Sequence, residues 1–358
     1  MFKWFLLLFY LLSSGLMAQE GNLLQLKIDG IPPSTLIKYQ KQFEDSLSVY
    51  KEVSDVLNQL QFKGYFYADT ESGGWEEGTF AIRLVTGESF RLLALKNGNV
   101  PQQALSEIRF KERLYKNVAF DLVEINQLKE RLLIWYENNG FPFAKVWLDS
   151  FAYNNNRLSA SIFAEPGEEI LIHSIRITGS AKLNSSFIET YLGLKPNRPY
   201  QEQRILELDK RIAELPFVKT MRNSEVEFVG NKAKINLFLD RMDANQFDGL
   251  IGFLPNQTTG KLQLTGDFRL RLLNALKQGE TLAFNYKGLP QQTQELDLSF
   301  NYPYVFKSAL GVGLDFALFK QDTAFINISN KIALVYNYKA NHALSFFVDN
   351  QSSRVIGQ

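Results

Sequence analysis

The hydrophobic and polar positions of the chain follow two different periods, and the change between them falls near residue 245. Before this point, three stretches repeat apolar residues at helical spacing, and each stretch predicts a helix with one buried stripe. The stripes are Val49, Val53, Val56 and Leu60; Ile125, Leu128, Leu132 and Trp135; and Ile205, Leu208, Ile212 and Leu215.

Each predicted helix leads into a strand through a similar corner. The corners read KGYFYADT from Lys63, NNGFPFAKV from Asn138 and ELPFVKTM from Glu214, roughly 75 residues apart. A second repeated element places Gly87 and Gly167 in matching Gly-Glu turns, each followed by an apolar strand. A fixed period in this range is typical of repeated modules.

Shorter helices are expected before the long ones, over residues 101–111, 183–194 and 35–43. Two strands joined by a polar turn follow each of the last two long helices, over residues 143–153 and 157–164, then 218–228 and 232–239. Each copy therefore predicts the order strand, helix, helix, strand, strand.

From Phe247 onward the period becomes two, which predicts strands with one apolar face. In KLQLTGDFRLRL, the apolar positions alternate with charged and polar ones, and six further segments behave similarly or are rich in glycine. Seven strands are expected, and no helical pattern interrupts them. They fit either a soluble antiparallel sandwich or a transmembrane β-barrel; strands of about 10 residues with aromatic ends favour the barrel.

The first 18 residues have the layout of a secretory signal peptide. Lys3 precedes an apolar run from Trp4 to Leu12, and small residues lead to a cleavage site after Ala18. A membrane anchor is the alternative, but the run is shorter than the roughly 20 residues that span a bilayer. The absence of cysteine excludes a lipid anchor at this site.

Composition excludes several classes of function. The 39 basic and 38 acidic residues form no basic run, so nucleic acid is not expected as a partner. Without cysteine, and with two histidines, the chain offers no thiolate nucleophile and no cysteine- or histidine-rich metal site. Gly311 and Gly313 lack the third glycine of a nucleotide fingerprint, and Glu168 and Glu169 are expected in a solvated turn. No catalytic, cofactor-binding or metal-binding residue is predicted, and the chain is not expected to be an enzyme.

The order of elements and the glycine-aromatic corners resemble the POTRA domain, a periplasmic polypeptide-transport module. The resemblance covers three copies, over residues 23–87, 88–167 and 168–242, although ELPFVKTM in the third lacks the glycine. NALKQGETLAFNY, with its N-x-x-x-x-G-E pattern, and LSFNYPYVF, with F-x-x-P-Y, resemble the first turn and fourth strand of BamA/TamA-type barrels. The expected fold is α+β tandem POTRA-like repeats (β-α-α-β-β) followed by an antiparallel transmembrane β-barrel, of which residues 246–358 are the N-terminal part.

The resemblance implies an outer-membrane protein of a Gram-negative-type bacterium with its repeats in the periplasm. It implies a factor that binds unfolded outer-membrane polypeptides and templates their insertion, with outer-membrane lipid and accessory periplasmic or lipoprotein subunits as further partners and no cofactor. Such a barrel needs about sixteen strands, so the chain is interpreted as a fragment. Two alternatives stay open: a two-partner-secretion-like transporter, which usually has two such repeats and a plug helix, and a soluble periplasmic scaffold.

The chemistry that this function needs is exposed backbone, because an unpaired strand edge can bind an extended polypeptide. Two strands are candidates, one in the third copy and one at the start of the predicted barrel. The candidate binding residues are Val218, Thr220, Arg222, Ser224, Val226 and Phe228, then Phe247, Gly249, Ile251, Gly252 and Phe253. Gly249 and Gly252 either weaken a seam that opens or relieve packing and curvature.

Overall fold

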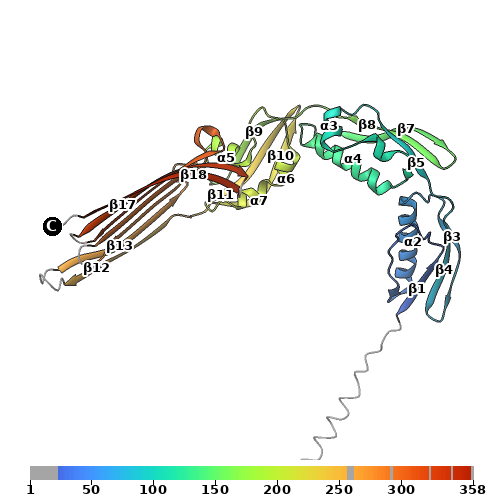
Figure 1. The fold of residues 1–358 in the computed structure, drawn as a ribbon, viewed down its shortest axis with the longest axis horizontal. Coiled ribbons are helices and arrows are strands. Elements are labelled where there is room, and N and C mark those ends of the chain that lie inside the picture. The colour runs from blue at the N-terminus through green and yellow to red at the C-terminus, as the bar shows by residue number, and fades with distance from the viewer. Residues whose placement is uncertain (1–22, 256–261, 291–292, 322–323, 340–341, 356–358) are drawn as a thin grey trace, which may run out of the picture. The chain divides into compact units, whose positions relative to one another are not determined.

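A computed structural model describes residues 23–255, 262–290, 293–321, 324–339 and 342–355 (Figure 1). The predicted signal peptide lies outside these residues. The chain divides into two compact units. The first contains the described residues up to Trp135 together with Lys145–Glu165, and the second contains Tyr136–Ala144 and the described residues from Pro166.

The first unit begins with a four-stranded sheet in the order β2-β1-β4-β3, with β1 and β4 parallel. Its elements are β1 (Leu24–Asp29), β2 (Gln42–Phe43), α2 (Ser46–Phe62), β3 (Asp69–Glu76) and β4 (Thr79–Val85). Asp45 caps α2 by accepting a 2.8 Å hydrogen bond from the Ser48 N–H. The four predicted stripe residues of α2 are buried, as expected. The helix predicted over residues 35–43 is wrong, because its end pairs with β1 as the short strand β2.

A second sheet has the same arrangement, in the order β6-β5-β8-β7 with β5 and β8 parallel. Its elements are β5 (Arg91–Asn97), α3 (Gln102–Glu107), the 3₁₀ helix η1 (Glu112–Tyr115), β6 (Val118–Ala119), α4 (Leu122–Glu137), β7 (Lys145–Asn154) and β8 (Arg157–Glu165). Ile125, Leu128 and Leu132 are buried as predicted, whereas Trp135 is half-buried and Tyr136 takes the last buried position. The Trp135 indole N–H instead donates to Glu107, at 2.9 Å.

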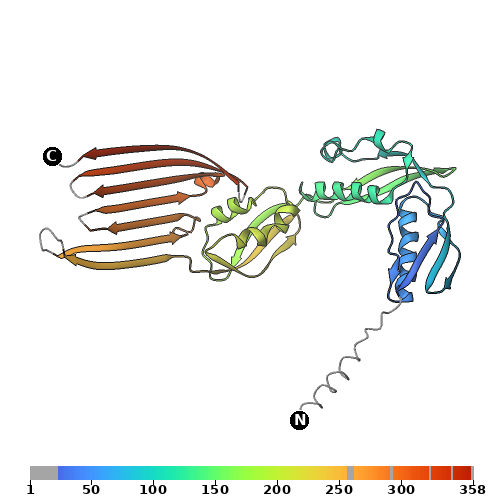
Figure 2. The same ribbon diagram turned by 60° about the horizontal axis from the view of Figure 1, so that its bottom comes forward.

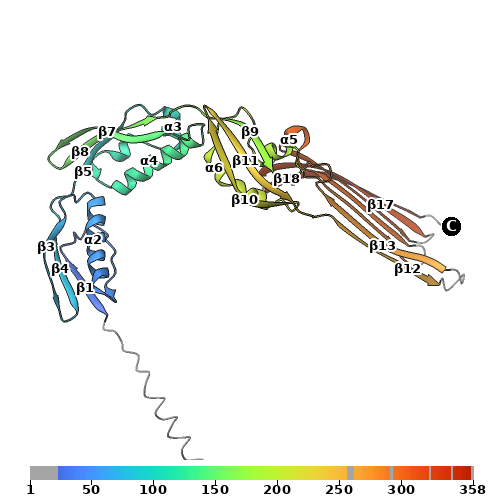
Figure 3. The ribbon, with the colours of Figure 1, turned by 180° about the vertical axis from the view of Figure 1, so that it is seen from behind.

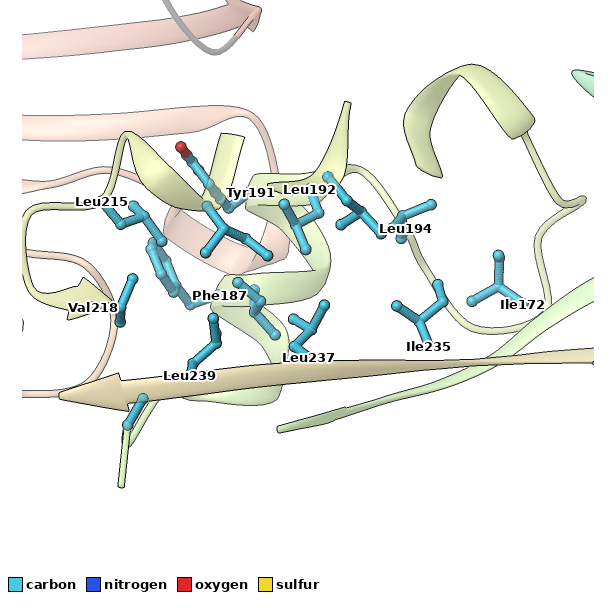
Figure 4. Packing of buried hydrophobic residues seen from close by; sticks show 14 of the residues in the cluster. Ile172, Phe187, Tyr191, Leu192, Leu194, Leu215, Val218, Ile235, Leu237 and Leu239 are labelled. Carbon is cyan, nitrogen blue, oxygen red and sulfur yellow. The ribbon is translucent and has the colours of Figure 1, made fainter. Parts of the chain in front are cut away.

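The second unit opens with a three-stranded sheet, β10-β11-β9, in which β9 and β11 are parallel. Its elements are β9 (Leu171–Thr178), α5 (Ser185–Leu192), α6 (Glu202–Leu206), α7 (Leu208–Ala213), β10 (Val218–Val229) and β11 (Lys232–Arg241). An isolated bridge between Leu171 and Pro199 stands where β2 and β6 lie in the other sheets. Figure 4 shows Leu237 and Leu239 of β11 pointing toward α5 in the core.

The single helix predicted over the third stripe is wrong, because α6 and α7 are separate helices that meet at Glu207. Two arginines, one from each helix, reach the carboxyl end of α5. Arg204 donates to the Gly193 carbonyl, and Arg211 donates to the carbonyls of Tyr191 and Leu192. These arginines satisfy carbonyls that the end of α5 leaves without helical partners. We refer to α5–α7 and β9–β11 as the third α+β module.

The seven strands predicted after residue 245 are confirmed, and they form one antiparallel sheet in chain order (Figure 2). They are β12 (Gln246–Pro255), β13 (Leu262–Leu273), β14 (Thr281–Gly288), β15 (Gln294–Tyr302), β16 (Leu310–Gln321), β17 (Phe325–Lys339) and β18 (His342–Val355), with the 3₁₀ helix η2 (Val305–Lys307) before β16. Within the described residues, β12 and β18 each pair on one side alone, so the closed barrel stays a prediction.

The strand register gives this sheet one apolar and one polar face. One row across the apolar face runs through Phe247, Leu270, Phe284, Leu298 and Phe316. The polar face carries cross-strand hydrogen bonds from Ser299 to Asp315, at 2.7 Å, and from Ser329 to Asp349, at 3.0 Å. We call these the apolar face and the polar face of the seven-stranded sheet.

Candidate functional site

Strand β10 lies at an edge of its sheet, where the edge-binding hypothesis requires it (Figure 3). Among the described residues it pairs with β11 and with no other strand. Of the candidate residues, Val218 is buried in the core, Thr220, Ser224 and Val226 are half-buried, and Arg222 and Phe228 are exposed. The Phe228 ring packs edge-on against Phe143, with 4.9 Å between ring centres.

The middle of the β10 edge is occupied by the protein itself. The backbone N–H and the hydroxyl of Ser224 both donate to the Asp209 carboxylate of α7, at 3.1 Å and 2.5 Å to Oδ1. The register between β10 and β11 shifts twice here, from Thr220 to Arg222 and from Arg222 to Glu225. Asp209 therefore divides the edge into two shorter segments, because a bulge with a satisfied N–H cannot continue a regular ladder.

Strand β12 is an edge of the seven-stranded sheet, and its candidate residues lie on it in two sets. Phe247, Gly249, Ile251 and Phe253 are on the apolar face, while Gly252 is on the polar face. The three large side chains are 75%, 58% and 67% exposed, in chain order. Among the residues that the structure describes, this edge has backbone groups without a strand partner and an exposed apolar row.

The two glycines of β12 have tight surroundings. The Phe268 ring lies over Gly249, where an added Cβ atom would be 3.2 Å from it, and the same ring is 3.2 Å from a Cβ built on Gly266. At Gly252 an added Cβ would lie 2.8 Å from the Thr265 hydroxyl oxygen. An aromatic ring that covers glycines supports the packing interpretation; the weakened seam stays a prediction.

Sequence reasoning missed a junction inside the second unit, where the turn between β13 and β14 contacts α5. The turn, residues 274–280, is held by its own side chains. The Glu280 carboxylate, 2% exposed, accepts hydrogen bonds from the N–H groups of Leu276 and Gln278, and the Asn274 side chain accepts one from Gly279. These are the three fixed positions of the N-x-x-x-x-G-E pattern, so the pattern was the available signal.

The turn between β15 and β16 contacts the same helix. Tyr304 packs against Phe187 and Tyr191 of α5, with ring centres 5.9 Å and 6.4 Å apart. Burial raises the pKa of the Tyr304 phenol. Burial also raises the pKa of Tyr191, and the nearby charge of Glu214 raises it further. Both phenols therefore stay neutral, and the half-buried Tyr304 packs against the core of the third α+β module.

A cavity of about 200 Å³ lies at this junction, next to the turn of residues 274–280. Its wall combines apolar side chains of the module core with the cations Lys182, Arg241 and Lys277. Arg241 forms an ion pair with Asp243, at 3.2 Å.

No helix within the described ranges has the length and apolar character to cross a membrane. The same residues contain no cluster of three or more potential metal ligands.

Comparisons with known proteins give structural similarities. No protein-family profile matches the chain, and no curated protein matches its sequence. The structure is similar to BamA from Haemophilus ducreyi lacking POTRA domains 1–3, with 14% identity and a TM-score of 0.48, over 74% of this chain and 51% of that one. It is also similar to CdiB from Acinetobacter baumannii, with 14% identity and a TM-score of 0.45, over 75% of this chain and 55% of that one. For BamA POTRA3–5 from Haemophilus influenzae the identity is 12% and the TM-score 0.39, over 64% of this chain and 100% of that one. The chain spans about half the length of the first two structures.

Proposed function

We propose that this chain acts in outer-membrane protein assembly, as a BamA/TamA-type factor with POTRA-like modules in the periplasm and a membrane-embedded sheet. The observation that carries the proposal is the two-faced seven-stranded sheet. Its apolar face leaves Phe247, Ile332 and Phe346 more than half exposed, while its polar face is tied by side-chain hydrogen bonds. Alternating strands with one apolar face are typical of transmembrane barrels, whose apolar side meets lipid.

The edge strands supply the polypeptide-binding step. In hydrocarbon, the unpaired N–H and C=O groups of β12 have no water to bind, so pairing with an incoming strand is strongly favoured. In the module, β10 offers an edge of the same kind to a polypeptide in water. Unfolded outer-membrane polypeptides, which are rich in potential strands, are the substrate class that both edges fit. The free energy comes from completed backbone bonds and buried apolar side chains, so no nucleotide is needed.

Single cysteines test this function directly, because the chain has none of its own. Cysteine replaces Ile251 on β12 in one variant and Ser299 on β15 in a control, and each is presented with an unfolded outer-membrane polypeptide that carries cysteines. We expect disulfide crosslinks at position 251 and few at 299, because β15 is paired on both sides. Crosslinks that avoid β12 in an inserted protein would contradict templating.

A two-partner-secretion-like transporter is the second candidate, and the polar face favours it. Asp315, Ser299 and Asp297 are on that face, which would line the lumen of a barrel. Transport through a lumen predicts crosslinks at 299 and 315 in place of 251. Recovery of the chain in the soluble periplasmic fraction would contradict both candidates and support the scaffold alternative.

A further inference from the structure

Two neighbouring turns at the module end of the seven-stranded sheet share an unusual pattern. Leu276 is followed by Lys277, and Phe306 by Lys307. Leu276 is 64% exposed and Phe306 is 95% exposed. Both lysines are exposed as well, and both have a left-handed backbone, with φ of 64° and 57°. We call the pairs Leu276–Lys277 and Phe306–Lys307 the two tips.

Helix α5 holds both tips by their backbones. At its start, the N–H of the N-cap residue Asn184 donates to the Lys277 carbonyl, at 2.8 Å. Beyond its end, the Lys195 ammonium donates to the Lys307 carbonyl, at 3.1 Å. Tyr304 packs on the same helix through Phe187. The tips are therefore fixed in place while their apolar and cationic side chains extend into solvent.

The charge around the tips is positive. Lys182 precedes α5 in the chain and Lys195 follows it, and both are exposed. Each is bonded to one of the two turns, Lys182 through its carbonyl to Asn274 and Lys195 through its ammonium to the Lys307 carbonyl. The acidic residue of the first turn, Glu280, is buried, and its two oxygens accept hydrogen bonds from that turn. Asp243 is paired with Arg241. Within the described residues, no ion pair neutralises the four exposed cations Lys182, Lys195, Lys277 and Lys307.

The position of the tips relative to the apolar face indicates what they bind. Tyr302 ends β15 on the apolar face next to the Phe306 tip, and Leu310 and Tyr336 are cross-strand neighbours on the same face beyond it. Aromatic residues followed by lysines mark the boundary between hydrocarbon and headgroups in membrane proteins. Moving an exposed Phe side chain from water into this boundary is favourable, because its apolar surface leaves water. Lysines at the same boundary are attracted to anionic headgroups.

We propose that the two tips anchor the module end of the sheet in a bilayer surface that contains anionic phospholipids. Leu276 and Phe306 enter the interfacial region, and Lys277 and Lys307 bind phosphate groups of the lipids. This inference rests on the proposed function in one respect, that the apolar face of the sheet is embedded in the same bilayer. Helix α5 then fixes the third α+β module at a set position above the membrane surface.

Depth measurements on the full chain test the anchor. Phe306→Cys and Leu276→Cys carry a nitroxide label, and Leu206→Cys on α6, which is 76% exposed, is the control in the same module. The labelled chains are reconstituted into vesicles of phosphatidylcholine, with and without phosphatidylglycerol. We expect oxygen to reach the labels at 276 and 306 better than a water-soluble nickel chelate does, and the reverse at 206. Labels at 276 and 306 that stay fully open to the chelate in both lipids would overturn the anchor.

The lysines give a second, independent measurement. Replacing Lys277 and Lys307 by Gln should weaken the carbonate-extractable association with phosphatidylglycerol vesicles, which precedes insertion, about fivefold per lysine. The control double variant, Lys210→Gln with Lys232→Gln, changes exposed lysines elsewhere in the module and should bind like the parent. High salt should remove the difference in vesicle binding between the Lys277/Lys307 double variant and the control double variant. If inorganic phosphate alone moves the labels at 276 and 306 as lipid does, the site binds free phosphate and the membrane anchor is wrong.

The two proposals fail in different ways. A chain that is stripped from vesicles by alkaline carbonate, yet binds anionic vesicles through Lys277 and Lys307, contradicts the embedded sheet and keeps the surface-binding tips. A chain that resists carbonate while the labels at 276 and 306 remain in water keeps the embedded sheet and overturns the anchor.

Discussion

The ring of Phe187 lies where a Cβ atom on Gly279 would stand, since such an atom would be 2.2 Å from Cε2 of the ring. Gly279 also has a φ of +73°, which side chains disfavour. Gly279→Ala should therefore separate the turn from α5, at a cost of about 1–2 kcal/mol for the backbone and about 1–3 kcal/mol for the clash. Native-state hydrogen exchange of the α5 amides measures the loss.

Gly230 provides the matched control for this substitution. It also has a positive φ, +56°, but no atom lies within 4 Å of an added Cβ. Gly230→Ala should show the backbone cost alone. Adding Phe187→Ala to Gly279→Ala should cost less than the sum of the two, because the clash disappears with the ring. Additive effects would contradict a direct clash.

The buried carboxylate of Glu280 makes a second prediction. Glu280→Gln leaves one acceptor oxygen for two N–H groups, those of Leu276 and Gln278. An unsatisfied buried N–H costs about 1–3 kcal/mol, so this variant should expose the turn to proteolysis and speed exchange at Gln278. Glu227→Gln, at an exposed position of β10, should change neither. Unchanged protection at Gln278 would show that the carboxylate does not hold the turn.

The same turn shows how far the sequence could predict this site. The N-x-x-x-x-G-E pattern was visible, and the structure gives each fixed position a role: Asn274 and Glu280 bind the turn's N–H groups, and Gly279 makes room for Phe187. What the pattern could not show is the partner of the turn. Phe187 is 92 positions away in the chain and reads, in sequence, as an ordinary apolar position of a short helix.

Periodicity predicted the sheets better than the helices. All seven alternating strands after residue 245 are present, because one apolar face fixes the register of each strand. The third stripe wrongly predicted a single helix, because apolar spacing indicates which residues are buried and does not show whether the helix is continuous. Leu208 and Ile212 are buried, but α6 ends before them. The bond between Asp209 and Ser224, which blocks the middle of β10, could not be predicted from the sequence. The two residues belong to different elements, and the turn after α7 separates them.

A contact between Lys63 and Asp121 predicts a pH dependence in the first unit. Burial acts to raise the pKa of Asp121, but the 2.6 Å bond from Lys63 and the N–H groups of Glu124 and Val123 lower it overall. Because the folded pKa lies below the unfolded value of about 3.9, the stabilisation is complete above that value and is lost as the pH falls through the folded pKa. The protection of amides near Phe120, measured relative to their intrinsic exchange rates at each pH, should therefore fall in acid.

Two variants check the origin of this dependence. Lys63→Gln removes the cation and brings the folded pKa of Asp121 closer to the unfolded value, so the loss of protection in acid should be smaller than in the parent. Asp121→Asn removes the titrating group and should flatten the profile over the same range. A profile that is unchanged in Asp121→Asn would assign the acid sensitivity to another carboxylate.

The bond between Asp209 and Ser224 predicts how the β10 edge is controlled. Asp209→Ala frees the Ser224 N–H and should join the two edge segments, because an inward-reaching charge on an edge strand discourages pairing. We expect more crosslinks from an unfolded polypeptide to Thr220→Cys and Val226→Cys in the Asp209→Ala background than in the parent.

Ser224→Ala is the matched control, since it removes the hydroxyl donor and leaves the N–H bonded to Asp209. It should leave the crosslinks at positions 220 and 226 near the parent level. The loss of a bond to a charged acceptor costs about 1.5–3 kcal/mol, so hydrogen exchange of β11 must show that the module stays folded in Asp209→Ala. A folded variant with no gain in crosslinks would mean that the Asp209 contact does not limit the edge, and that polypeptides bind elsewhere in the module.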